Sequence, residues 1–525
     1  MKLTLPPRIS PRQFDAALMA FAGVVGKDWV MAGDADRDAY ADVYAPGPQE
    51  QWPASAAVAP GSVDEIRALV RLANEHKVPL WPVARGKNLG YGTAAPRMAG
   101  SVVLDLGRMN RILEIDPKLA YCVIEPGVGY FDLYEAIQRE KLPLWLSVPG
   151  NAWGSVLGNA LDHGIGYTPY GLHARNLCGV EVVLPDGDLI RTGMGAMDEN
   201  PAWHLFPFGY GPTWDLAFSQ SGFGIVTKAG MWLQPAPQSS LELTFDIPGE
   251  DDIGWVVDTI APMKISGLIE QNVFIPSWLG KMVLKGQRKD FWDKPGAIPE
   301  WRVKELLDQY KLGYWQVALR LYGEEPVVRA KAEIVKAAMG RHLKAPPAEN
   351  WWHEGDEINC LATTMGVPSA VPLQMSDWIG GRGAHLGFSP VVPATGEHVL
   401  GQMKRSRKVI DSFDVDFYAS FTIGGRFANN VNMLMFDRDQ PGQIETVKNL
   451  FNALIEETAR AGYGEYRTHL GWMDRVMDTY GFNQGALRRF NEKVKDALDP
   501  NGIIAPGKQG VWPAAYRDMA KGGRT

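Results

Sequence analysis

The stretch PVARGKNLGYG, residues 82–92, joins the end of an apolar run to a loop that contains three glycines. The run itself, VPLWPV at 78–83, predicts a β-strand. Gly86, Gly90 and Gly92 let the backbone that follows bend tightly and bring its N–H groups close to a phosphate. The spacing matches neither a Walker loop nor a GxGxxG fingerprint. An ordinary turn is therefore the alternative to a phosphate-binding loop.

The segments around this loop predict alternating helices and strands. SVDE at 62–65 has the serine and glutamate of a capping box and predicts the start of a helix. Strands are predicted at 101–107 and 121–127, and a helix at 131–140. This order is typical of βαβ units with a glycine-rich loop after a strand.

The second half of the chain has a different pattern, with strands between longer helices. SSLELTFDI (239–247) predicts a strand and PVVRAKAEIVKAAMG (326–340) a helix. The tail holds another predicted helix, ALRRFNEKVKDAL (486–498), followed by the turn DPNG at 499–502. We therefore expect a second, α+β domain and a tail that returns to helical structure.

The composition limits the classes of function. A chain of 525 residues is expected to form two or three domains. The net charge of −7 and the lack of a long basic run argue against nucleic-acid binding. Three widely spaced cysteines predict no disulfide framework and favour the cytoplasm. The apolar stretch 16–26 is too short to span a membrane and predicts a helix that begins at Ser10-Pro11, with a signal-peptide core as the alternative.

Two further glycine-rich stretches stand out. VPGNAWGSVLGNALDHGIGYTPYG, residues 148–171, carries few charges and is unsuited to a long helix or strand. GFGIVTK at 222–228 is similar. Such stretches indicate a backbone laid against a flat ligand, and a purely structural loop is the alternative.

GGRGAHLGFSP at 380–390 and GYGEYRTH at 462–469 place chemically active side chains in short segments. The glycines around His385 predict a loop. That histidine could bind a metal, act as a base or lie in the core. A metal is disfavoured because the nearest candidate segment, HEGDE at 353–357, lacks the HExxH spacing. The adjacent Tyr466 and Arg467 could be purely structural.

In order, the motifs GKNLGYG, WGSVLGN with GYTPYG, GAHLGFSP, GYGEYRTH and DPNGIIAPGK resemble the vanillyl-alcohol oxidase and p-cresol methylhydroxylase family of flavoproteins, and within it the bacterial members that oxidise eugenol. The resemblance covers nearly the whole chain. It implies an α+β fold with a PCMH-type FAD-binding domain of two α/β subdomains over residues 1–238 (core about 53–238). It also implies a cap domain with a large antiparallel sheet at 239–463, and a C-terminal segment, 464–525, that returns to the FAD domain.

The resemblance implies FAD as the cofactor, bonded covalently to His385, which lies where the oxidases of the family carry their flavin-linked histidine. The family's cytochrome-coupled hydroxylases use a tyrosine instead. No metal is expected. The other residues expected to bind FAD are Arg85, Gly86, Lys87, Asn88, Leu89, Gly90, Ser155, Asn159, Gly164, Tyr170, Gly224, Ile225 and Lys508.

Tyr91, Tyr466 and Arg467 lie where the family binds a phenol. The implied reaction is oxidation of a para-substituted phenol, such as a 4-alkylphenol, eugenol or vanillyl alcohol, by hydride transfer to FAD, with O₂ as the final acceptor and H₂O₂ as a product. The quinone methide then adds water or loses a proton, and an alcohol substrate goes on to the aldehyde. The expected pocket residues are Gly150, Asn151, Ile165, Tyr167 and Thr422, although Ile165 and Tyr167 could equally be core residues.

One position departs from the family. Its oxidases usually carry an aspartate before the WGS segment, and alignment on Trp153 puts Gly150 there, with Asn151 beside it and Ser147 three residues earlier. None of these is a carboxylate. We expect less assistance to water attack on the quinone methide, more alkene product, and room for bulkier substituents.

Four readings remain open at this stage. The first is the oxidase, and the second is a dehydrogenase of the same family that passes electrons to a cytochrome. The third is a sugar or lactone oxidase, which is disfavoured because ARGKNLGYG has no histidine. The fourth is a non-catalytic flavin-binding protein. The expected partners are a small phenol and O₂, with no nucleic acid or membrane, in a homodimer or an octamer.

Overall fold

The computed structural model describes residues 3–48, 51–359 and 361–522, so Cys360 lies outside the described chain. The first sheet has the spatial order β1 (Val30–Met31), β2 (Ala56–Val58), β4 (Val102–Asp105), β3 (Leu80–Val83). β2, β4 and β3 run parallel, and β1 is antiparallel to β2. α1 (Pro11–Val25) and α3 (Val63–His76) pack together and share a core with these strands.

The second sheet is antiparallel. Its order is β5 (Ile112–Asp116), β6 (Tyr121–Ile124), β10 (Ile225–Trp232), β8 (Leu177–Val183), β9 (Leu189–Arg191). α4 (Tyr130–Arg139) and α5 (Val156–Leu161) contribute to its core. β7 (Leu144–Trp145) and β11 (Gln234–Pro235) pair separately. The first half of the chain thus contains two α/β units, as expected.

The middle of the chain forms a broad antiparallel surface from two adjoining sheets. One has the order β14 (Trp315–Gly323), β12 (Ser239–Ile247), β15 (Ala348–His353). The other runs β13 (Val273–Pro276), β18 (Ser420–Ile423), β19 (Phe427–Asp437), β17 (Pro390–Pro393), β20 (Gly464–Glu465), and β16 (Gly383–Phe388) also pairs with β19. A bridge between Ser277 and Trp315 connects the two sheets. We call this combined surface the cap sheet.

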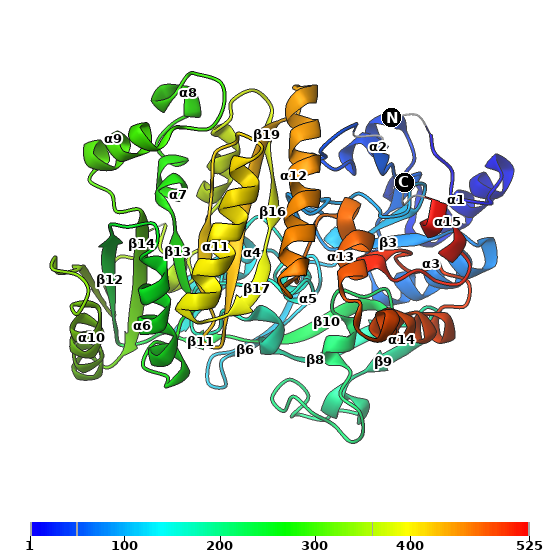
Figure 1. Ribbon diagram of the computed structural model, residues 1–525. Helices are drawn as coiled ribbons and strands as arrows, with labels where there is room; N and C mark the ends of the chain where they lie inside the picture. Colours follow the sequence, from blue (N-terminus) through cyan, green and yellow to red (C-terminus); the bar gives the residue numbers. More distant parts are fainter. Residues whose placement is uncertain (1–2, 49–50, 360, 523–525) are drawn as a thin grey trace.

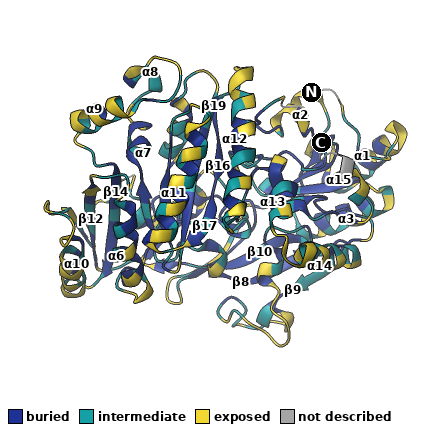
Figure 2. Ribbon diagram, in the orientation of Figure 1, coloured by how far each residue is buried: buried dark blue, intermediate teal, exposed yellow. Residues whose placement is uncertain are grey.

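Four helices cover one face of the cap sheet: α6 (Ile253–Ile265), α10 (Glu325–Met339), α11 (Gly396–Asp411) and α12 (Pro441–Arg460) (Figure 1). Side chains alternate along a strand, so Leu241, Leu243 and Phe245 of β12 are buried in the core that they share with α6 and α10. Figure 2 shows this burial as dark strands behind helices whose outer faces are exposed. The opposite face of the sheet is therefore free to line a cavity.

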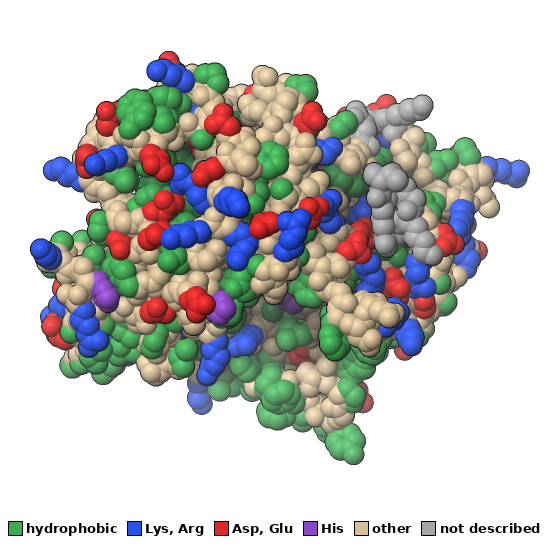
Figure 3. Space-filling view, in the orientation of Figure 1, with side chains coloured by type: hydrophobic (Ala, Val, Ile, Leu, Met, Phe, Trp, Pro, Cys, Tyr) green, Lys and Arg blue, Asp and Glu red, His purple; other side chains and the backbone are tan. Residues whose placement is uncertain are grey.

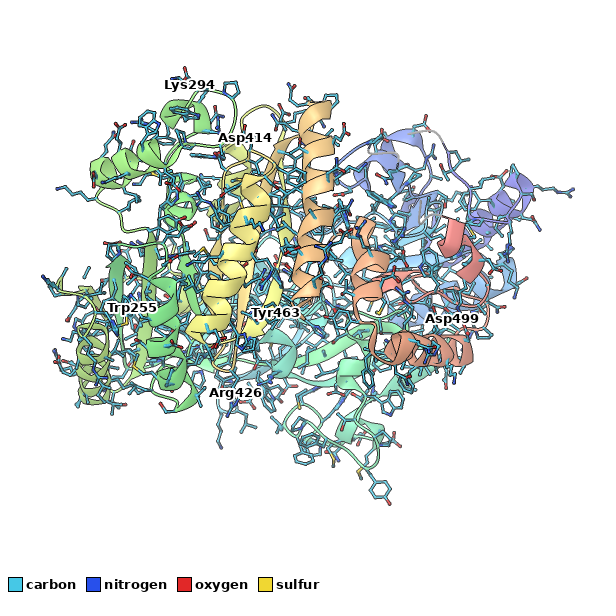
Figure 4. The ribbon with its side chains drawn as sticks, in the orientation of Figure 1. Trp255, Lys294, Asp414, Arg426, Tyr463 and Asp499 are labelled. Atoms are coloured by element: carbon cyan, nitrogen blue, oxygen red, sulfur yellow. The ribbon has the colours of Figure 1, made fainter. Side chains whose placement is uncertain are left out.

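The C-terminal segment returns to the first sheet through α13 (Met473–Thr479), α14 (Phe482–Leu498) and α15 (Arg517–Gly522) (Figure 1). Leu80 of β3 donates its N–H to Ile503 O (2.7 Å) and accepts from Ala505 N (2.8 Å). The buried ammonium of Lys495 donates to Asp499, labelled in Figure 4, and to two backbone carbonyls. These three hydrogen bonds of the buried lysine fix the C-terminal segment against the Gly222 backbone of the first half of the chain.

Further side-chain contacts and helices complete the fold. Tyr463, just after α12, shares a hydrogen bond with His398 of α11 (2.7 Å; Figure 4). The remaining helices are α2 (Asp34–Ala39), α7 (Trp278–Met282), α8 (Arg288–Phe291) and α9 (Glu300–Tyr310). Within the described residues, no helix is both long and apolar enough to cross a membrane.

Most of the predicted elements are present, and two predictions are wrong in detail. GGRGAHLGFSP is not a loop, because residues 383–388 form β16 and pair with β19. The capping box at 62–65 is half formed. Ser62 accepts from Glu65 N, but the Glu65 carboxylate accepts from Gly61 N instead.

Candidate functional site

One large cavity, of about 1040 Å³, lies between the first-half loops and the free face of the cap sheet. The glycine-rich loop lines one end, and the 148–171 stretch and the C-terminal segment line its sides. Most of the predicted site residues meet here: Tyr91, Gly150, Asn151, Ile165, Tyr167, Thr422, Tyr466, Arg467, His385, Arg85, Gly86, Lys87, Asn88, Leu89, Ser155, Asn159, Gly224, Ile225 and Lys508.

Three predicted residues lie just behind the cavity wall. Gly90 supports the ring of His385, because a Cβ there would come within 3.2 Å of the imidazole. Gly164 lies against the Asn159 side chain, which leaves no space for a Cβ. Tyr170 offers its carbonyl to the Asn176 amide and does not line the cavity.

The glycine-rich loop makes a cationic end to the cavity. Gly86, Gly90 and Gly92 all have positive φ, which L side chains rarely adopt, so the sequence needs glycine at these points. Arg85 is ion-paired with Asp132 (2.6 Å) and Lys87 lies over the ring of Trp153. A long cavity with a glycine-rich, cationic end suits an anionic dinucleotide.

His385 lies on β16 opposite Met435 of β19, with its ring against the glycine-rich loop. Its Nδ1 lies 3.4 Å from the Ser376 hydroxyl, which is 2.8 Å from the Tyr44 hydroxyl. Burial lowers the pKa of His385 to about 4. The imidazole is therefore neutral near pH 7 and keeps a lone pair available for a bond to a ligand.

Arg467 forms the polar centre of the site together with two tyrosines. Its guanidinium carbon lies 4.2 Å from the centre of the Tyr91 ring and 5.8 Å from that of Tyr466. Burial alone would lower the pKa of Arg467, but Tyr91, Tyr466 and Asp162 together raise it. Its Nε is buried and has no hydrogen-bond partner among the residues that the structure describes. An unsatisfied cationic donor in a cavity fits an anionic ligand or a ring oxygen.

Neighbouring groups hold this centre in place. The Gln220 amide donates to the carbonyl of Tyr466 (3.1 Å). The Tyr91 hydroxyl lies beside Gly387, where a Cβ would come within 2.9 Å of it. Burial raises the pKa of Tyr466, and the nearby Arg467 opposes the shift. Tyr466 therefore stays neutral and can donate a hydrogen bond.

The pocket next to this centre is aromatic. The rings of Tyr167 and Phe274 lie 5.3 Å apart. A Cβ at Gly150 would lie 3.2 Å from the Tyr167 hydroxyl, so this hydroxyl fills part of the space that a glycine was expected to open. Burial raises the pKa of Tyr167 to about 12.

Sequence reasoning missed several lining residues. Phe274, Asn429 and Met433 come from cap-sheet strands, Tyr418 lies two residues before β18, and none of them belongs to a recognisable motif. The sequence could have indicated Asp162, because this residue lies inside the glycine-rich stretch 148–171. It accepts from the Asn88 amide (3.1 Å) and lies 3.9 Å from both Arg467 and Lys508.

A buried hydrogen-bond network behind the cavity holds the 148–171 stretch in place. His173 Nδ1 lies 2.6 Å from Asn159 Oδ1, and its Nε2 lies 3.0 Å from the Ser147 hydroxyl. Burial lowers the pKa of His173 to about 3, so it works as a neutral hydrogen-bonding group. Across the described residues, no group of three or more His, Cys, Asp or Glu side chains converges on a possible metal position.

Comparison with known proteins agrees with this geometry. The FAD binding domain family matches residues 54–193, and the C-terminal domain family of FAD linked oxidases matches residues 368–509. The 4-cresol dehydrogenase [hydroxylating] flavoprotein subunit of Pseudomonas putida is 34% identical over 97% of both chains. The 1'-carboxy-chondrochloren decarboxylase of Chondromyces crocatus is 30% identical over 97% of this chain and 100% of its own.

Two solved structures are similar over nearly their whole length. The 4-ethylphenol oxidase from Gulosibacter chungangensis, in complex with isoeugenol, has a TM-score of 0.92 and 34% identity, covering 97% of this chain and 99% of its own. A p-cresol methylhydroxylase with substrate bound has a TM-score of 0.91 and 33% identity over the same shares. The cofactor of this chain is FAD, and the glycine-rich loop and the large cavity fit it.

Glu465 lies next to the polar centre, and its burial should make the free energy of unfolding depend on pH. Burial raises the pKa of this carboxyl from 4.5 to about 8, against an opposing hydrogen bond from Ser389 N. In the unfolded chain it loses its proton near pH 4.5. The folded state therefore holds an extra proton between about 4.5 and 8, and stability falls as pH rises through that window.

We expect Glu465→Gln to remove this loss. The difference in unfolding midpoint between the variant and the wild type should be small at pH 5, grow to pH 8 and then level off. The full effect corresponds to a few kcal/mol. Calorimetry across this range measures it, with the exposed Glu445→Gln as control. A difference that is constant with pH would contradict a neutral Glu465.

Proposed function

The chain belongs to the vanillyl-alcohol oxidase and p-cresol methylhydroxylase family of FAD-dependent oxidoreductases, and from this premise we propose that it oxidises para-substituted phenols at the benzylic carbon and passes the electrons to O₂. The observation that carries the proposal is the group of Tyr91, Tyr466 and Arg467 in the cavity, where the Arg467 Nε has no partner among the described residues. The 4-cresol and 4-ethylphenol enzymes among its relatives support the substrate class. Eugenol and vanillyl alcohol are further candidate substrates.

The first task of the site is to bind the phenol as phenolate. A free phenol titrates near pKa ~10, so ionising it at pH 7 costs about 4 kcal/mol. Arg467 can donate charge-assisted hydrogen bonds and two tyrosine hydroxyls can add to them. Each such bond to a charged group contributes about 1.5–3 kcal/mol, so three donors can offset the cost.

The second task is to direct the reaction. When bound, FAD supplies the hydride acceptor. Arg467, Tyr91 and Tyr466 hold the ring oxygen so that its electrons can move through the ring as the benzylic hydride leaves, which gives a neutral quinone methide. Water then adds to the quinone methide to give an alcohol, or the quinone methide loses a proton from the next carbon of the chain to give an alkene. When the substrate is an alcohol, its quinone methide loses the hydroxyl proton and gives the aldehyde.

The direct test follows flavin absorbance. Under anaerobic conditions, 4-ethylphenol, eugenol or vanillyl alcohol should bleach the bound flavin, and air should restore it with formation of H₂O₂. Arg467→Met should slow bleaching by about a hundredfold or more, because the phenolate loses its charged partner. Bleaching without peroxide, together with rapid reduction of an added cytochrome c, would favour the cytochrome-coupled dehydrogenase. Failure of all three phenols to bleach the flavin would sink the proposal.

We also propose a covalent bond between FAD and His385. The neutral imidazole against the glycine-rich loop supports it. After acid precipitation, flavin should stay with the wild-type protein and be released from His385→Ala. His342→Ala, at an exposed histidine, is the matched control. Release of flavin from the wild type would contradict the bond.

Gly150 should also influence the product. In the wild type no carboxylate side chain exists at position 150 to assist water, so 4-ethylphenol should give mostly alkene. Gly150→Asp should raise the alcohol share several-fold. Chromatography of products from the wild type and the variant measures the ratio, and an unchanged ratio would refute the idea. The same pair can be compared on propyl and methoxylated phenols, although the Tyr167 hydroxyl limits the space gained.

For organisation, we propose that residues 1–238 form the FAD-binding domain, 239–463 the cap and 464–525 a returning segment. We further propose a homodimer, with an octamer as the alternative, in the cytoplasm. Large exposed side chains in the segment after β9 support an interface: Phe206, Phe208, Tyr210 and Trp214. The segment after β9 lies at the bottom of Figure 1, and Figure 3 shows hydrophobic side chains on the surface there. Cys122 and Cys178 are free thiols, which fits a reducing compartment.

A further inference from the structure

The cavity extends beyond the phenol site into a space with polar walls. Alternation along β12 sends Leu241 and Leu243 toward the helices and Glu242 toward the cavity. Glu242 lies opposite Arg320 of β14 on one side and Asn350 of β15 on the other. We call this space the polar chamber, and its walls are Glu242, Gln271, Lys281, Gln316, Arg320 and Asn350.

An aromatic neck connects the phenol site with the polar chamber. Tyr167 packs against Phe274 and interacts electrostatically with both Arg467 and Tyr418. The Tyr418 hydroxyl lies 3.4 Å from where a Cβ at Gly280 would be, and Gly280 directly precedes Lys281. A para substituent points away from the phenolate oxygen. A long one would therefore pass the neck toward Lys281.

Most of the charge in the polar chamber is already compensated. The Arg320 guanidinium donates to Glu242 (3.1 Å), to the Ser240 hydroxyl (3.0 Å) and to the Thr364 hydroxyl (3.1 Å). The side-chain amide oxygen of Gln271 accepts a hydrogen bond from the backbone N–H of Arg320. This part of the wall is neutral, and its groups are held by one another.

Lys281 differs from its neighbours. It lies on α7, half-buried, and the structure gives its ammonium no hydrogen bond or ion pair with any described residue. Burial lowers its pKa, and Asp246 and Glu242 oppose the shift from a distance. Asp246 accepts from Gln316, and Glu242 is paired with Arg320. An anion inside the chamber would give Lys281 the direct partner that it lacks.

We propose that the polar chamber binds the far end of a para side chain and that Lys281 pairs there with a carboxylate, so that the preferred substrates are phenols with an anionic para chain. This inference rests on the proposed function, because it assumes that Arg467 binds the phenol oxygen. It adds a second recognition point, which neutral 4-alkylphenols do not use.

Paired ligands test the inference on the FAD-loaded protein. Each pair is a 4-hydroxyphenylalkanoate and the primary alcohol of the same length, in a series from two to seven chain carbons. Dissociation constants come from anaerobic perturbation of the flavin spectrum, and kcat/KM from turnover. Beyond a threshold length the carboxylate should bind about tenfold or more tightly than its alcohol, as a desolvated charge pair implies.

Three variants test whether Lys281 causes the preference for the carboxylate over the alcohol. Lys281→Met should abolish it and leave the alcohols and 4-ethylphenol within about twofold of the wild type, whereas Lys281→Arg should retain it. Lys285→Met is the control, because Lys285 is exposed and lies outside the cavity. Equal binding of acid and alcohol at every length would overturn the inference, as would equal losses for both in Lys281→Met. If neutral 4-ethylphenol reduces the flavin but no carboxylate preference exists, only this inference fails. If no phenol reduces it, the proposed function fails first.

Discussion

The buried guanidinium of Arg467 is the constraint on which the rest of the site depends. A cation in a protein interior needs compensation, and here the nearest carboxylate, that of Asp162, is 3.9 Å away. The faces and hydroxyls of Tyr91 and Tyr466 supply most of the rest. Tyr91 lies within the glycine-rich loop, between Gly90 and Gly92, while Tyr466 and Arg467 follow the cap sheet. The charge is therefore stable only when both parts of the protein have closed around it.

Residues 464–469 connect the cap sheet to the N-terminal part of the protein and bring the two together around Arg467. Gly464 and Glu465 form β20 at the edge of the cap sheet, and Arg467 already lies in the cavity. His469, two residues further, is completely buried and lies 2.7 Å from the Asp42 carboxylate of the N-terminal segment. The chain then continues to the 503–505 segment, which pairs with β3. The hydrogen bond between His469 and Asp42 thus fixes the crossing that positions Arg467.

The sequence reveals the parts of this design that require special residues. Positive φ at Gly86, Gly90 and Gly92 demands glycine, so the loop was visible as a motif. Helical faces such as that of α3 were visible from their spacing. The order of motifs then led to the family and hence to the fold class and to FAD.

The cap-sheet contribution was not visible in the same way. Phe274 and Tyr418 lie in or beside strands whose alternation is ordinary, and which face lines a cavity depends on the packing of distant helices. From the sequence alone, the glycines around His385 predict a loop. Pairing with β19 overrides that local signal, and the glycines instead let Tyr91 and the loop approach the strand closely. Lys281 shows the same limit, since its lack of a partner emerges only from the three-dimensional arrangement.

Burial also explains why an arginine holds this position. The same dehydrated environment neutralises other groups around it: the pKa of His385 falls to about 4 and that of Glu465 rises to about 8. Tyr167, at about 12, stays protonated. A lysine or histidine could lose its proton under such conditions, but a guanidinium keeps its charge because its ordinary pKa is so high. Burial thus neutralises His385 and Glu465 and leaves the charge on Arg467, which is where a phenolate needs it.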